Sequence, residues 1–218
     1  MTQRREFLKH ASLLAVGTMS AGRLEAQELP QVQGSYDMSW TAKVTGKYRM
    51  AFDAPALNGT SLHQVRSFLA GYGTVYGLTD AELSAVLIVR HANVPMVLGD
   101  ALWADAPWGE KEGPKDPATG EDAKRNPFIN VPADAEHATT WPDGTLDKLM
   151  ARGVIVLACD LALGNAAGGI ARRRKIPMQD AQQLVTEHLI PGVYRMPSGI
   201  FATCHAQGVG CGMMYAGD

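Results

Sequence analysis

Short apolar runs alternate with amphipathic stretches along most of this chain. Residues 84–89 and 154–158 are almost wholly apolar and rich in β-branched side chains, a pattern typical of strands buried on both faces of a parallel sheet. Shorter runs at 48–53, 191–196 and 211–215 predict three further strands. The sequence therefore predicts a sheet of five strands.

Helical spacing of apolar residues appears between these runs. A helix is predicted to begin at Thr60 or Ser61 and to fade between residues 71 and 77, with apolar side chains at positions 62, 65, 69 and 72 on one face. Further helices are predicted at 145–152, from 161 to the basic run at 172–175, at 179–188 and at 198–207, the last capped by Ser198, and a short one at 96–103. This alternation predicts an α/β fold with a mostly parallel five-stranded sheet and helices on both faces.

Two segments depart from the alternation. Residues 27–46 are polar without a clear period and are predicted to form an N-terminal arm before a single domain at 47–218. Residues 105–143 contain six prolines among glycines and charged residues and are predicted to be an insertion too polar to form a core of its own. A segment of this length without regular structure is usually functional or disordered, so a lid, an oligomer arm and a linker all stay open.

The first residues resemble an export signal. Gln3 to Lys9 carry paired arginines followed by Phe-Leu and Lys, as in twin-arginine (Tat) signals, and the apolar stretch 11–21 is too short to span a bilayer permanently. Cleavage after Ala26 would release a periplasmic protein without a membrane segment; the alternative is an ordinary basic N-terminus. Losing residues 1–26 changes the formal net charge from −2 to −4, which argues against a nucleic-acid partner.

Cys159 is the first candidate for chemistry, because it stands where the apolar run at 154–158 gives way to the next helix. Ligands of open α/β sheets bind beyond the carboxyl ends of the strands, and a helix N-terminus favours a thiolate. Asp160, directly after it, opposes the thiolate. The alternative is an inert cysteine packed like a small hydrophobic residue.

The C-terminal region holds several soft metal ligands. Cys204, His205, Cys211 and Met213, with Met214 beside them, suit copper or an axial haem contact, although the spacing excludes covalent haem attachment. Successive residues of a strand point to opposite faces, so only some of these side chains can converge. The favoured interpretation places the methionines in the core and pairs Cys204 with Cys211 as a structural disulfide, which leaves Cys159 as the odd thiol.

Several of these segments together resemble the DsrE/DsrF-like (sulfur-relay) superfamily. The resemblance rests on Lys47 to Asp53 and its following helix, the strand ending at His91, the strand from Gly153 to Cys159, the segments 189–193 and 197–199, and Ala206-Gln207 before the last strand. It covers most of 47–217 outside the insertion. It implies a flavodoxin-like layering, a trimer or hexamer, and a cysteine at position 159 that accepts sulfane sulfur as a persulfide and passes it to a partner.

Two further residues are candidates for assisting Cys159. His91 ends a strand expected to neighbour that of Cys159 and could supply charge or a proton; the alternative is a structural histidine. Asn58 follows the first strand and could donate a hydrogen bond at the same edge; the alternative is a turn residue.

The predicted function is therefore an exported carrier of sulfane sulfur, closer to a sulfur transferase than to a turnover enzyme, without a cofactor. Its partners would be a sulfur donor and acceptor, either proteins or small sulfur compounds. The alternative is a periplasmic binding protein for copper, haem or a small ligand, with Cys159 structural.

Overall fold

The computed structural model describes residues 35–110 and 113–217 and has one five-stranded parallel sheet. The strands are β1 (Tyr48–Ala54), β2 (Leu83–Val89), β3 (Ile155–Cys159), β4 (Tyr194–Met196) and β5 (Gly212–Tyr215), in the spatial order β4-β3-β2-β1-β5. Every adjacent pair is parallel, so the carboxyl ends of the strands share one edge. The α/β fold expected from the sequence is confirmed.

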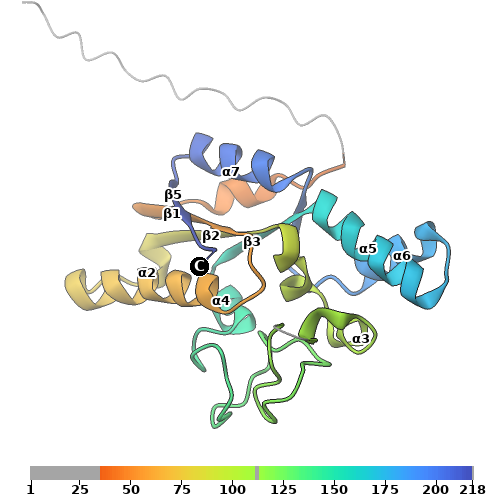
Figure 1. Cartoon of the computed structure of the whole chain (residues 1–218). Helices are drawn as coiled ribbons and strands as arrows, with labels where there is room; N and C mark the ends of the chain where they lie inside the picture. The colour runs from red at the N-terminus through yellow and green to blue at the C-terminus, as the bar shows by residue number, and fades with distance from the viewer. Residues whose placement is uncertain (1–34, 111–112, 218) are drawn as a thin grey trace, which may run out of the picture. The chain divides into compact units, whose positions relative to one another are not determined.

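Helices cover both faces of this sheet. The α-helices are α2 (Thr60–Tyr76), α3 (Asp100–Trp103), α4 (Leu146–Ala151), α5 (Asp160–Arg174), α6 (Met178–Glu187) and α7 (Gly199–Gly208). Short 3-10 helices are η1 (Ser39–Lys43), η2 (Asp80–Glu82), η3 (His91–Val97) and η4 (Pro107–Gly109). Figure 1 shows α7 on one side of the sheet and α2 and α4 on the other.

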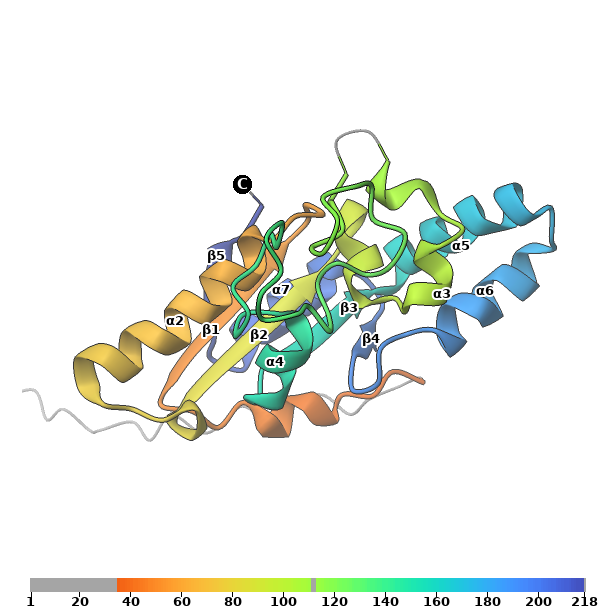
Figure 2. The same cartoon turned by 90° about the horizontal axis from the view of Figure 1, so that it is seen from below.

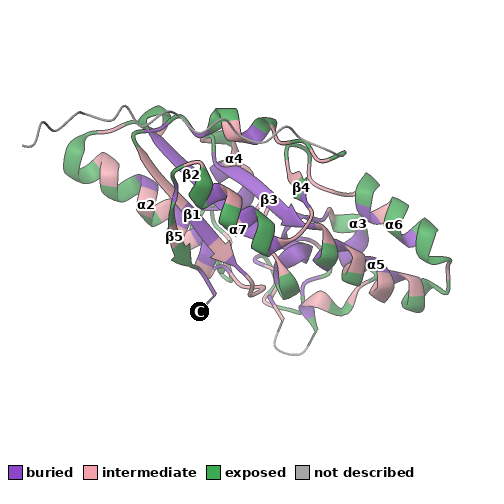
Figure 3. Cartoon of the chain, turned by 90° about the horizontal axis from the view of Figure 1, so that it is seen from above, coloured by how far each residue is buried: buried purple, intermediate pink, exposed green. Residues whose placement is uncertain are grey.

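Alternation along the central strands builds a core on each face. In β2, Leu87 and Val89 belong to the larger core, which lies under α2, α4 and α5, whereas Val86 and Ile88 belong to the smaller core with Trp40 of η1. Every residue of β2 and β3 is buried, as Figure 3 shows in purple. The continuous apolar runs of the sequence arise because both faces of these strands are covered.

Several predicted boundaries are confirmed within a few residues, and one predicted helix is corrected. Ser198 caps α7 by accepting a hydrogen bond from the backbone N–H of Phe201 at 3.1 Å. The helix expected at 60 ends at Tyr76, within the range expected for its end, and Gly77 follows in the left-handed conformation with φ of 67°. The single helix expected at 96–103 is instead two elements, η3 and α3, because the backbone is extended at Gly99, whose N–H bonds the carbonyl of His188 at 2.8 Å.

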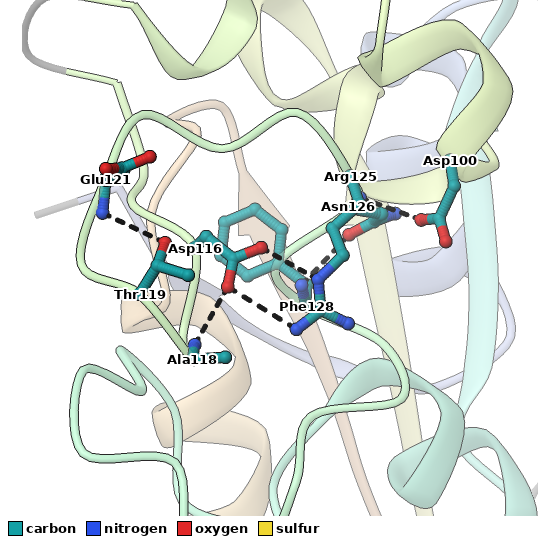
Figure 4. Close-up of polar contacts among 8 residues, drawn as sticks. All are labelled: Asp100, Asp116, Ala118, Thr119, Glu121, Arg125, Asn126 and Phe128. Atoms are coloured by element: carbon teal, nitrogen blue, oxygen red, sulfur yellow. Dashed lines mark hydrogen bonds and ion pairs between the residues drawn. The ribbon is translucent and has the colours of Figure 1, made fainter.

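The insertion packs against the main core rather than extending away from it. Phe128 is fully buried in the larger core and contacts Trp103 edge-on. The side-chain amide of Asn126 donates to the carbonyls of Met96 and Leu98 at 2.8 and 2.9 Å, and its backbone N–H donates to Asp100 (Figure 4). The insertion covers the same face as α4 (Figure 2), so the described part of it is a folded layer of the domain.

Candidate functional site

Cys159 is both the last residue of β3 and the N-cap residue of α5. The strand ends there because the backbone turns directly into the helix, whose first residue is Asp160. The cysteine is only 5 % exposed. Its position at the carboxyl edge of the sheet and at a helix N-terminus is the one expected from the sequence.

The thiol is reached through a pocket of about 560 Å³. Its walls come from three elements at the carboxyl edge: the segment after β2 (Arg90 to Ala92), the first turns of α5, and the start of α7 (Ser198 to Ile200). The N-termini of α5 and α7 therefore both border it, and helix N-termini carry partial positive charge. The pocket is suited to an anion.

His91 lies in this pocket with Cys159, as the adjacency of their strands predicted. It lies two residues after the end of β2, begins η3 and is exposed. Its φ of 54° lies in the left-handed region, which is uncommon for residues other than glycine, although histidine adopts it more often than most. The chain turns sharply here at the end of β2, which places the imidazole at the pocket wall.

Arg90 is a pocket residue that the sequence analysis did not select. Its guanidinium forms a bidentate ion pair with Asp53 of β1, with Nη2 2.7 Å from Oδ2, and the two side chains are only 14 % and 15 % exposed. The hydrogen bond to Asp53 is the main cause that raises the pKa of Arg90, and smaller charge interactions with Tyr215 and Cys159 act in the same direction. The guanidinium is therefore fixed at the pocket wall near the thiol, with its charge balanced by the carboxylate of Asp53.

The start of α7 is shaped around Arg90. A Cβ built on Gly199 would lie 2.5 Å from Cδ and 2.8 Å from Cβ of Arg90. Because Asp53 fixes the guanidinium, the arginine cannot move aside without losing its ion pair. Gly199 thus lets the N-terminus of α7 come close to Arg90 at the pocket.

Asp160, which the sequence analysis regarded as opposing a thiolate, is paired in the structure. Arg195 of β4 donates from Nε to Oδ1 at 2.9 Å, and the Tyr36 hydroxyl donates to Oδ2 at 3.0 Å. Burial is the main cause that raises the pKa of Tyr36, followed by this hydrogen bond. The carboxylate next to Cys159 therefore has a cation and a donor that offset its charge.

Asn58 is not among the residues of this pocket. Its side-chain oxygen accepts from the backbone N–H of Thr60 at 3.0 Å, and its amide donates to the carbonyl of Gly217 at 3.1 Å. It fixes the turn into α2 and ties it to the chain after β5. These contacts are those of a turn residue, which was the alternative interpretation of Asn58. None of them involves Cys159.

The C-terminal soft ligands point in different directions. Cys204 is exposed on α7, while Cys211 is buried directly before β5, and both are free thiols, so the expected disulfide is not formed. The cause is helical rotation of about 100° per residue: Ala202 and Ala206 face the sheet, so the residue midway between them faces away. Met213 packs on the smaller core and Met214 is exposed.

His205 packs among aromatic rings. It stacks on Phe201 with ring centroids 5.5 Å apart and meets Trp40 edge-on. Burial lowers its pKa. Within residues 35–110 and 113–217, no group of three or more histidine, cysteine, aspartate or glutamate side chains could hold a metal ion.

Comparison with known proteins does not identify a family for this chain. Models of known protein families find no match in the chain, and no curated protein matches it closely enough to be reported. No helix in the described part of the chain is sufficiently long and apolar to cross a membrane. The candidate site therefore stands on its own residues: Cys159, with Arg90, His91 and two helix N-termini around it.

Proposed function

We propose that the protein is a carrier of sulfane sulfur and that Cys159 holds the sulfur as a persulfide. The observation that carries this proposal is the position of the thiol, at the floor of a pocket that Arg90 and the N-termini of α5 and α7 border. Positive charge favours the thiolate, which is the nucleophile in sulfur exchange.

The chemistry needs no resident cofactor. The Cys159 thiolate attacks a sulfur atom of a polysulfide, a new S–S bond forms, one S–S bond of the polysulfide breaks, and the shortened polysulfide leaves with the electron pair. An acceptor thiolate then attacks the outer sulfur of the persulfide and releases the Cys159 thiolate. Sulfur is transferred without net oxidation of the protein, so a carrier describes it better than a turnover enzyme does.

Export and assembly belong to the same proposal. The twin-arginine motif at residues 3–9 supports export to the periplasm, and that motif lies outside the described residues. The resemblance to sulfur-relay proteins supports a homo-oligomer, a trimer or a hexamer. Sulfur donors and acceptors in the periplasm would then be its partners.

Intact-mass spectrometry after treatment with polysulfide tests the proposal. We expect the wild-type chain to gain the mass of one or more sulfur atoms and to lose it on reduction, and we expect Cys159→Ser to gain none. Cys204→Ser is the matched control, because it removes an exposed thiol outside the pocket, and it should load as the wild type does. Equal loading of wild type and Cys159→Ser would overturn the assignment.

A further inference from the structure

A second hollow lies beside the Cys159 pocket along α5. This second hollow has a volume of about 430 Å³ and lies between α5 and the segment around η4. Asn165 of α5 lines both hollows. The two hollows lie next to each other along α5 and are together called the α5 groove, with the thiol at one end and Trp108 at the other.

Apolar side chains border the α5 groove at both ends. Leu161 and Ile200, at the thiol end, are each 67 % exposed. Pro107, Trp108 and Ile170 line the far end. Exposed apolar side chains gathered around a reactive residue are typical of a surface that another molecule covers.

Among the described residues, the far end of the groove carries more positive than negative charge. Asp105, the carboxylate that lines this end, pairs with Arg174, and Glu110 outside the lining pairs with Arg173 at 3.6 Å. Arg172 has no carboxylate partner among the described residues, and its Nη1 would lie 3.6 Å from a Cβ built on Gly168. The guanidinium thus folds back along α5 toward Cys159.

The distance along α5 between Cys159 and the guanidinium of Arg172 determines how long a ligand must be to contact both. Gly168 lies nine positions after Cys159 along the chain, which corresponds to about 14 Å of helix at ~1.5 Å per residue. An extended peptide advances about 3.3 Å per residue, so about four residues bridge the distance. Both hollows of the groove are open to solvent, so an extended peptide segment can lie along them.

We propose that the α5 groove binds an extended segment of a partner protein, in which a cysteine meets Cys159 and acidic residues about four positions away meet Arg172. This inference rests on the proposed function, because it identifies the sulfur-exchanging partner as a protein with an acidic, partly apolar segment. Arg172 and Trp108 are binding residues in this account, and neither touches the reacting sulfur atoms.

Two synthetic peptides test the charge preference. Each has an N-terminal cysteine activated as a 2-thiopyridyl disulfide, leucine in the middle, and either two glutamates or two lysines at the fourth and fifth positions after the cysteine. The assay uses Cys204→Ser protein and its further variants, because the exposed Cys204 thiol would also release thiopyridine. Attack by the Cys159 thiolate then forms a mixed disulfide and releases thiopyridine, whose absorbance gives the rate. We expect the acidic peptide to react about threefold faster or more at low salt, although the net charge of the chain is negative.

Variants distinguish the effect of the groove residues on the rate from the effect of the overall charge of the protein. Arg172→Glu should abolish or invert the rate ratio, and Trp108→Ala should slow both peptides. Lys148→Glu makes the same charge change at an exposed site on α4 and should keep the ratio. A ratio near one in the wild type, or equal loss of preference in Lys148→Glu, would overturn the proposal.

A non-covalent measurement keeps the two proposals distinguishable. Fluorescence anisotropy of the same peptides with serine in place of cysteine, on Cys159→Ser protein, should show tighter binding of the acidic peptide and loss of that preference in Arg172→Glu. If the acidic peptide binds more tightly as expected while polysulfide loads no sulfur on the wild type, the assignment of the groove as a peptide-binding site is supported and the carrier proposal fails. If neither peptide binds or both bind equally, the groove assignment fails whatever the sulfur chemistry.

Discussion

Replacing Arg90 with glutamine should weaken the fold markedly, because it leaves Asp53 without its cation. The pair joins β1 to the segment after β2 through two hydrogen bonds, and the two side chains are 14 % and 15 % exposed. Removing one partner of a fully buried pair costs about 3–5 kcal/mol of unfolding free energy. The remaining exposure lets water reach the carboxylate, so we expect a loss of about 2–4 kcal/mol and a fall in Tm of roughly 5–12 °C.

Urea denaturation of the wild type, Arg90→Gln, Asp53→Asn and the double variant measures this loss. The double variant should be more stable than the sum of the two single losses predicts, by about 1 kcal/mol or more, because no unpaired charge remains. Arg66→Gln is the matched control: its pair with Asp143 is 27 % and 59 % exposed, so it should cost less than about 1 kcal/mol. An Arg90→Gln protein within about 0.5 kcal/mol of the wild type would refute the reasoning.

Three further outcomes follow from the contacts at and beyond the site. Arg195→Gln should slow alkylation of Cys159 by iodoacetamide at neutral pH several-fold, and adding Asp160→Asn should restore the rate; an unrestored rate would mean that Arg195 acts in another way. Asn126→Ala should lower the unfolding free energy by about 2–4 kcal/mol in urea titrations, since it leaves two buried carbonyls without donors; a loss below about 1 kcal/mol would contradict this packing of the insertion. Burial lowers the pKa of His205 below its ordinary value of 6.5, so the neutral imidazole stabilises the fold above pH 6.5 and this stabilisation is lost as the pH falls through the lowered pKa. The urea midpoint of His205→Phe should therefore change less than that of the wild type as the pH falls below 6.5. An equal change in the two proteins would argue against this effect.

Features encoded locally were predictable from the sequence. The unbroken apolar run of β2 indicates a strand covered on both faces, and Ser198 before a helical stretch indicates an N-cap, so both are confirmed. Cys159 at the junction of strand and helix follows from the same change of period. Each of these depends on residues within one or two turns of the chain.

Features that depend on distant partners were not predictable in this way. Arg90 and Asp53 are 37 residues apart and meet only because β1 and β2 pair in a particular register. Asn126 looks like a loop residue until the carbonyls it bonds are in place. Asp160 was expected to oppose a thiolate because Arg195, its partner across β3 and β4, is 35 residues away.

Release of bound sulfur tests the central claim most directly. Cyanide attacks the outer sulfur of a persulfide, forms thiocyanate and frees the thiolate, so the thiocyanate released from polysulfide-treated, desalted protein counts transferable sulfur. We predict about one thiocyanate per chain from the wild type and from Cys204→Ser, and none above background from Cys159→Ser. Thiocyanate from Cys159→Ser at the wild-type level, or none from the wild type, would contradict the account.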